Sequence, residues 1–194
     1  MKFDELNRLK RFYSEMQVDN KDERVSLAIE LDEALLYIFA LISTEYALEK
    51  KKTEEDYYDL LMERFGDIFD EDDLSYEDEY LNDLAVEIID TTFRHMEEPY
   101  YRSQERALLI AQNEANTVYN HNDYLGAIEK GKKYKTWIAE MDDKTRPAHA
   151  LVDSERIPIN EFFIVGNEKM RYPHDFVYGS EANTVNCRCS CLYE

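Results

Sequence analysis

The sequence predicts an α+β protein, with a mainly α-helical N-terminal arm and a small α+β C-terminal module of short antiparallel strands. Three observations predict this class. Over residues 1–125 apolar side chains recur at steps of three and four, the period of helices buried on one side. Beyond Gly126 the apolar residues come in short runs separated by polar, Gly or Pro turns. Residues 1–100 carry 29 acidic and 11 basic side chains, net −18, whereas residues 101–194 carry 14 and 12, net −2. We therefore expect an acidic helical arm at 1–100 and a separate module at 101–194.

Apolar spacing predicts the helices in order along the chain. The longest carries Leu27, Leu31 and Leu35 on one stripe and ends at Lys50–Lys52, where cations suit the negative end of the helix dipole. The next begins at Thr53 with acidic residues in its first turn, and Gly66 is its expected terminator. The expected helices cover residues 1–18, 23–52, 53–66, 75–93 and 102–119.

The module has the pattern of short strands around a small helix. A strand is expected at 134–139, followed by a polar turn and a short helix that begins near Pro147, because proline is tolerated in a first helical turn. Further strands are expected at 156–159 and 162–165. The chain should close with a strand at 184–193.

Composition excludes several classes of protein. No window offers about 18 uncharged apolar residues, so we expect no membrane span, and the mixed-charge N-terminus lacks a signal sequence. All three cysteines lie within the last eight residues, which is no secreted disulfide framework and favours a reduced compartment. The net charge of −20 argues against binding duplex DNA over the whole surface and favours docking on basic protein partners.

Cysteine and histidine side chains concentrate in the module. Cys187, Cys189 and Cys191 alternate with other residues, so on a strand their sulfurs would share one face. With His149 and His174 they could supply a tetrahedral zinc site, for which the candidate ligands are His149, His174, Cys187 and Cys189. The alternative is that the cysteines are small buried apolar side chains and the histidines structural. The pattern leaves both interpretations open.

A basic stretch follows Gly126 and is a candidate contact for nucleic-acid phosphates. It is interleaved with Tyr134 and Trp137, which could stack on bases. Alternatively, the lysines form a solvated edge that protects a strand from unwanted pairing. The candidate residues are Lys130, Lys132, Lys133 and Lys135.

No motif indicates an enzyme. The sequence contains no nucleophile elbow, no Gly-rich phosphate loop and no HExxH metal helix. We expect no catalytic residues and a non-enzymatic protein. The alternative is a zinc-dependent hydrolase or nuclease in which Asp142 or Asp143 assists the histidines and cysteines.

Taken in order, the features of the module resemble the phage minor head proteins of the head morphogenesis family typified by protein F of phage Mu. A Lys-x-Trp strand, an Asp-to-His turn and helix, an acidic turn, a Pro-x-Asp loop and an Asn-Cys-Arg-Cys segment follow one another over about residues 103–194. The residues that carry the resemblance are Lys135, Trp137, Asp142, Arg146, His149, Asp153, Pro173, Asp175, Asn186, Cys187, Arg188 and Cys189.

The resemblance implies a structural protein of a tailed phage or prophage. Such a protein would associate with portal and capsid or scaffold proteins, and would act in head morphogenesis and in packaging or delivery of DNA. It would be in the bacterial host cytoplasm during assembly and then in the virion head. Packaged DNA is a further implied partner. Some relatives carry a toxin domain after the Cys-Arg-Cys segment; this chain stops at Glu194, so we expect no such effector.

Overall fold

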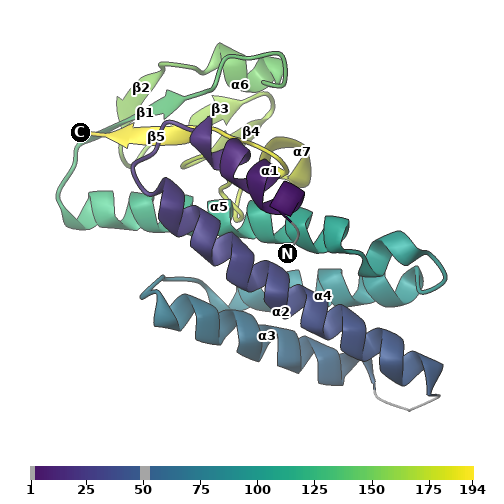
Figure 1. The fold of residues 1–194 in the computed structure, drawn as a ribbon. Helices are drawn as coiled ribbons and strands as arrows, with labels where there is room; N and C mark the ends of the chain where they lie inside the picture. The colour runs from purple at the N-terminus through teal and green to yellow at the C-terminus, as the bar shows by residue number, and fades with distance from the viewer. Residues whose placement is uncertain (1–2, 49–52) are drawn as a thin grey trace. The chain divides into compact units, whose positions relative to one another are not determined.

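The computed structural model of the chain describes residues 3–48 and 53–194. The helices are α1 (Phe3–Ser14), α2 (Lys21–Ala47), α3 (Glu54–Glu71), α4 (Asp78–Arg94), the 3-10 helix η1 (Pro99–Arg102), α5 (Gln104–Glu129), α6 (Pro147–Leu151) and α7 (Glu181–Thr184). The strands are β1 (Tyr134–Ile138), β2 (Arg156–Pro158), β3 (Phe163–Val165), β4 (Glu168–Met170) and β5 (Ser190–Tyr193) (Figure 1). Long helices followed by short antiparallel strands confirm the predicted α+β class. No helix of the described ranges is long and apolar enough to cross a membrane.

The chain divides into two compact units. One, which we call the helical unit, contains residues 26–112; the other, which we call the mixed unit, combines residues 3–25 with 113–194. The division falls inside α2 and α5, so both units take helical turns from each of these helices. The expected division into an arm at 1–100 and a module at 101–194 stays a prediction about domains.

The helical unit is built on the apolar stripes that the sequence predicts. Leu27, Leu31 and Leu35 are fully buried along α2, and α3 packs against α4. Helix α3 does not end at Gly66 as expected but continues to Glu71. A Cβ at Gly66 would lie 3.1 Å from the Tyr76 hydroxyl oxygen, so this glycine admits a neighbouring side chain rather than ending the helix. The lysines at 50–52, where this long helix was expected to end, lie outside the described residues.

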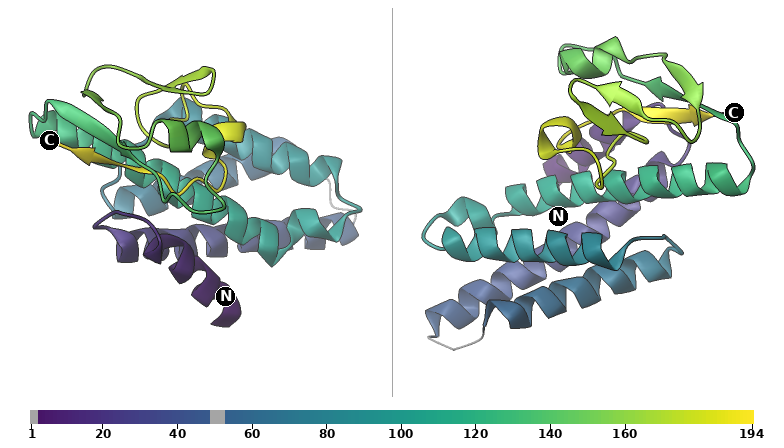
Figure 2. Two further views of the ribbon diagram at one scale, coloured as in Figure 1. Left: turned by 90° about the horizontal axis from the view of Figure 1, so that it is seen from above. Right: turned by 180° about the vertical axis from the view of Figure 1, so that it is seen from behind.

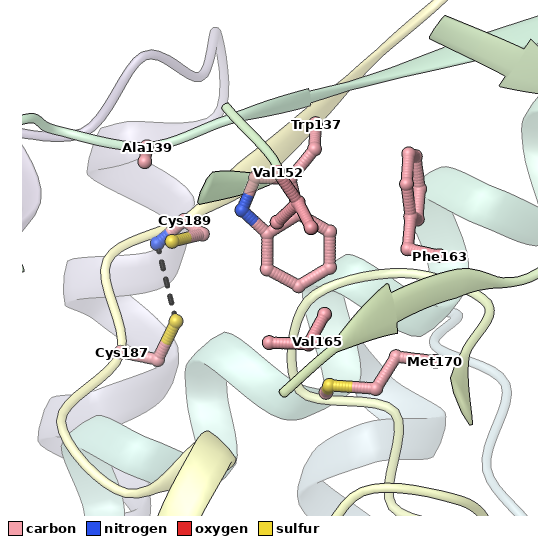
Figure 3. Packing of buried hydrophobic residues seen from close by; sticks show 8 residues of the cluster. All are labelled: Trp137, Ala139, Val152, Phe163, Val165, Met170, Cys187 and Cys189. Atoms are coloured by element: carbon pink, nitrogen blue, oxygen red, sulfur yellow. Dashed lines mark hydrogen bonds between the residues drawn. The ribbon is translucent and has the colours of Figure 1, made fainter. Parts of the chain in front are cut away.

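Strands of the mixed unit form two small antiparallel sheets that lie over the second half of α5 (Figures 1 and 2). In the larger sheet, of order β2-β1-β5, Thr136 pairs with Arg156 on one side and with Leu192 on the other. β3 pairs with β4, a strand that the apolar pattern did not indicate. The core between these elements consists of Trp137, Ala139, Val152, Phe163, Val165, Met170, Cys187 and Cys189 (Figure 3).

Three predicted boundaries in the mixed unit are wrong. The first helix, expected to reach residue 18, ends at Ser14. Helix α5 runs to Glu129, ten residues beyond the expected end, and its buried face continues with Asn120 and His121 before the apolar Tyr124 and Ala127. The closing strand is limited to Ser190–Tyr193, and the preceding residues form α7, a turn and an irregular segment. The turn places Asn186 at a φ of 57°, a left-handed conformation that asparagine adopts more readily than most residues.

Candidate functional site

His149, Cys187 and Cys189 form a buried cluster in the mixed unit. His149 lies on α6, and the cysteines lie in the irregular segment before β5. His149 Nδ1 is 3.4 Å from Cys187 Sγ and 3.4 Å from Cys189 Sγ, and the three ligand atoms lie within 4.8 Å of one another. Across the described residues, these side chains are the group of His, Cys, Asp and Glu whose geometry could hold a metal ion.

A chain of two hydrogen bonds fixes the orientation of the His149 ring. The Asn183 amide Nδ2 donates to Glu168 Oε2 at 2.8 Å, which orients the amide so that its oxygen faces His149 Nε2 at 3.1 Å. His149 Nε2 can then donate to this oxygen, while Nδ1 faces the two sulfurs. Bonds from Ser180 and Asn183 hold the pKa of Glu168 below its usual range, which keeps this carboxylate ionised.

Cys187 is the thiolate-forming member of the cysteine pair. A hydrogen bond from Cys189 lowers the pKa of the Cys187 thiol well below its usual range against the opposing effect of burial, and bonds with His149 and His174 lower it further. The same bond, together with burial, raises the pKa of Cys189. The Cys189 amide also donates to Cys187 Sγ at 3.4 Å, as Figure 3 shows. The Cys187 thiol is therefore the more acidic of the two.

A small pocket borders the cluster. Its volume of about 20 Å³ suits a single water molecule or ion, since one water needs roughly 10–15 Å³ of such space. Glu140 stands at its wall with Oε1 buried and unpartnered, and burial raises the pKa of this carboxyl. The lining residues are Glu140, Lys144, Thr145, Arg146, His149, Asn186, Cys187, Arg188 and Cys189.

His174, the fourth ligand candidate from the sequence, points to other partners. Its Nε2 lies 2.8 Å from the Cys187 carbonyl oxygen, to which it can donate, and its Nδ1 lies 3.2 Å from Thr117 Oγ1. The group of ligand atoms that the described residues bring together does not include it. His174 therefore anchors the backbone of the cysteine segment.

The candidate nucleic-acid residues separate into two environments. Lys130 and Lys133 are exposed and Lys132 is half-buried, so these three can reach a phosphate. Lys135 is fully buried, with its ammonium 5.1 Å from the ring centre of Tyr124 and a further aromatic ring at similar distance. Burial lowers the pKa of Lys135 to about 8. The prediction that Lys135 contacts nucleic acid is therefore wrong, because strand alternation turns its side chain into the core.

Three acidic side chains among the residues that carry the resemblance hold loops in place. Asp142 accepts two bonds from Arg188 Nη2, each of 2.7 Å, and this pairing lowers the pKa of Asp142 to about 2. Asp153 accepts a 2.8 Å bond from the Ala139 amide, and the fully buried Asp175 pairs with Arg171.

Three further residues that carry the resemblance also stabilise the fold. Arg146 donates to the Val185 carbonyl, and the buried Pro173 offers its carbonyl to α5. Trp137 is fully buried in the core, and its ring lies edge-on to that of His149 at 5.6 Å between centroids. Apart from the cluster and the core residues Lys135 and Trp137, most residues that carry the resemblance thus hold the irregular segments in place.

A stripe of asparagines on α5 completes the framework and was not singled out from the sequence. Asn113 accepts from the Asn186 amide at 2.8 Å, Asn116 donates to the Cys187 carbonyl at 3.0 Å, and Asn120 donates to the Pro173 carbonyl at 3.0 Å. Spacings of three and four place all three on one helix face. Asparagine disfavours helix interiors, so its recurrence along an expected helix is the signal that could have indicated this stripe.

The buried Arg24 binds this stripe from the other side. It donates to Asn116 Oδ1, to Asn120 Oδ1 at 3.1 Å and to Asp123 Oδ2 at 2.7 Å. Burial lowers the pKa of Arg24, and the facing Asp123 counteracts this effect. Residues from three distant parts of the sequence therefore form one polar network around the cysteine segment.

Comparison with known proteins identifies this framework. The family model described as Phage Mu protein F like protein matches residues 82–192, more than half of the chain, which indicates a phage head-related protein. The chain belongs to this family. No solved structure shows a significant match.

One curated relative is the NAD(+)–arginine ADP-ribosyltransferase EFV of Enterococcus faecalis. It is 30% identical over 130 residues, which cover 60% of this chain and 26% of the relative. The chain thus spans about a quarter of the length of this curated relative. The name of the relative describes the activity of that larger protein.

Proposed function

We propose that the protein is a structural, non-enzymatic minor head protein of a tailed phage or prophage. It associates with the portal and with capsid or scaffold proteins during assembly in the bacterial host cytoplasm, and it stays in the virion head. There it acts in head morphogenesis and in DNA packaging or delivery. The family match over residues 82–192 carries this proposal. The use of the matched residues as loop anchors supports a structural role.

The acidic surface of the helical unit supports docking on a basic partner. Asp59, Glu63 and Asp67 recur at four-residue steps along α3 and are all exposed, so they form a stripe on one face of the helix. The carboxylates next to it in the sequence, among them Glu71 and Asp73, are exposed as well. Such a one-sign field increases the association rate with an oppositely charged surface and weakens as salt rises.

Co-purification with the portal protein tests the proposal. The full chain and the portal protein encoded at the same locus are produced together, and the portal protein is recovered by a tag. We expect the chain to co-purify at low salt and to be progressively lost as salt increases. Failure to recover it with portal, capsid or scaffold proteins of its own locus would contradict the proposal.

Matched variants locate the docking surface. The variant Asp59→Asn/Glu63→Gln/Asp67→Asn removes three charges from the stripe and should reduce recovery at least several-fold. The control removes three exposed charges from the mixed unit instead, through Asp143→Asn, Glu155→Gln and Glu161→Gln. Equal recovery of the two variants would show that the stripe has no specific part in docking.

The solvent-accessible lysines after α5 supply the contact with packaged DNA in this proposal. Lys130, Lys132 and Lys133 follow one another at the turn before β1. Charge reversal of all three should weaken binding of the full chain to DNA and reduce the salt slope, by about one for each phosphate contact that is lost. Affinity and salt slope equal to those of the wild type in a filter-binding assay would exclude this surface.

A further inference from the structure

We propose that His149, Cys187 and Cys189 bind one soft divalent transition-metal ion, with Zn²⁺ as the physiological occupant. The fourth coordination position faces the adjoining pocket. This site would join α6 to the segment before β5 and is independent of the role in the phage head. It replaces the four-ligand set expected from the sequence with three ligands, because His174 points elsewhere.

The spacing of the donor atoms agrees with tetrahedral coordination. For Zn–N of about 2.05 Å and Zn–S of about 2.3 Å, a tetrahedral angle separates nitrogen and sulfur by about 3.6 Å. The separations here are 3.4 Å from His149 Nδ1 to each sulfur. The two nitrogen–sulfur separations therefore need to change by only a few tenths of an ångström to hold an ion, and all three ligand atoms lie within 4.8 Å of one another.

The chemistry of the donors selects the class of metal. Thiolate sulfur and imidazole nitrogen favour Zn²⁺ and related soft ions over Mg²⁺ and Ca²⁺, which prefer oxygen. With Nε2 facing the Asn183 amide oxygen, the neutral form of the His149 ring offers its Nδ1 lone pair to the ion. Hydrogen bonding of the second ring nitrogen to such a partner is the usual arrangement around metal-bound histidine.

The pocket supplies the remaining position. It borders all three ligands and has room for one water molecule, which would complete the tetrahedron. Glu140 Oε1, buried and unpartnered at the pocket wall, is placed to accept a hydrogen bond from such a water. The proposal thus gives a partner to a polar atom that otherwise has none among the described residues.

Cobalt binding provides the primary test, since Co²⁺ bound by thiolates in a tetrahedral site absorbs in the near ultraviolet and visible. The full chain is purified reduced and without chelator, its zinc content is measured, and the metal-free protein is titrated with Co²⁺. We expect about one ion per chain, thiolate charge-transfer absorption, and displacement by Zn²⁺. Trp137, the sole tryptophan, lies next to His149, so bound Co²⁺ should also quench its fluorescence.

The third cysteine offers a matched control. Cys191 lies opposite Trp137 in the β1–β5 ladder and is outside the cluster. Cys191→Ser should retain the cobalt spectrum, whereas Cys187→Ser and Cys189→Ser should lose the thiolate absorption. Asn183→Ala keeps all three ligands and should weaken affinity about 10–100-fold, because it removes the hydrogen bond that orients the His149 ring.

Thermal unfolding keeps the proposal testable even where a cysteine variant folds poorly. A ligand that binds the folded state raises the Tm with its concentration, so Zn²⁺ should raise the Tm of the wild type and of Cys191→Ser. Absence of stoichiometric Co²⁺ or Zn²⁺ binding by the folded, reduced wild type would overturn the proposal. Equal cobalt spectra in wild type and Cys187→Ser would do the same.

Discussion

The helical unit and the mixed unit reach a stable core by different means. The helical unit buries continuous apolar stripes of long helices, such as Leu27 and Leu31 on α2. The mixed unit has strands of three to five residues, and side chains such as Asn116 and Asp175 bond directly to its loop backbone. A short strand leaves much of the surrounding backbone without sheet partners, and buried backbone groups need partners from elsewhere. Buried polar residues therefore take over the part that helical hydrogen bonds play in the other unit.

The difference extends to what each unit can bind. The helical unit presents exposed carboxylates on regular helices, a surface suited to steering and docking a basic partner. The mixed unit uses its network to hold two thiols and an imidazole at fixed positions in the interior. Fixed geometry of this kind is what a metal site requires, and it depends on loops rather than on regular elements.

The largest expected effect concerns the core of the mixed unit. Trp137→Ala removes a fully buried ring and should lower the free energy of unfolding by about 3–5 kcal/mol. Leu151→Ala, a control on the exposed face of α6, should change it by no more than about 0.5 kcal/mol. Urea unfolding followed by circular dichroism measures both. A similar small loss in the two variants would mean that Trp137 does not organise this core.

Substitution on α5 tests the polar network itself. Asn116→Leu has similar volume but leaves the Cys187 carbonyl and Arg24 short of a partner, so we expect a loss of about 2–3 kcal/mol. Asn122→Leu, six residues further along α5, removes an amide that donates to the Val118 carbonyl of its own helix and should cost less than about 1 kcal/mol. Equal losses would erase the distinction drawn between the two units.

The smallest effect is the acid sensitivity of one loop anchor. Because Arg188 holds the pKa of Asp142 at about 2, below the ordinary value of 3.8, folding favours the ionised carboxylate. The contribution is fully present above pH about 4 and is lost as pH falls toward 2. As the pH falls from about 4 toward 2, the free energy of unfolding should therefore fall less in Asp142→Asn than in the wild type. In Asp143→Asn it should fall as it does in the wild type. Parallel curves for wild type and Asp142→Asn would remove Asp142 as an anchor.

The same contrast explains what could be predicted from the sequence. Helical periodicity is local, so it located the helices, and the short apolar runs located β1, β2 and β3. Strand β4 follows β3 across the two-residue turn Gly166–Asn167, a local hairpin signal that the apolar pattern alone did not reveal. The irregular path of Cys187–Cys189 depends on bonds between distant residues, such as Asn113 with Asn186, which apolar spacing does not encode.

Candidate site residues follow the same rule. The sequence indicated His149, Cys187 and Cys189 from residue type, and the structure brings these three together. It did not indicate Asn183 or Glu168, because a hydrogen-bonded chain that orients a ring has no spacing signature. Lys135 was misplaced because a lysine on a strand reads as surface, whereas here its ammonium lies among aromatic rings.

The central claim is that this chain is a component of a phage head, and protein analysis of purified particles tests it most directly. Particles from the phage or induced prophage that encodes the chain are separated into DNA-filled heads, empty heads and tails, and peptides are quantified by mass spectrometry. The account predicts that the chain is in the head fractions, in far fewer copies than the major capsid protein. Its absence from every head fraction in which the portal protein is detected would contradict the account.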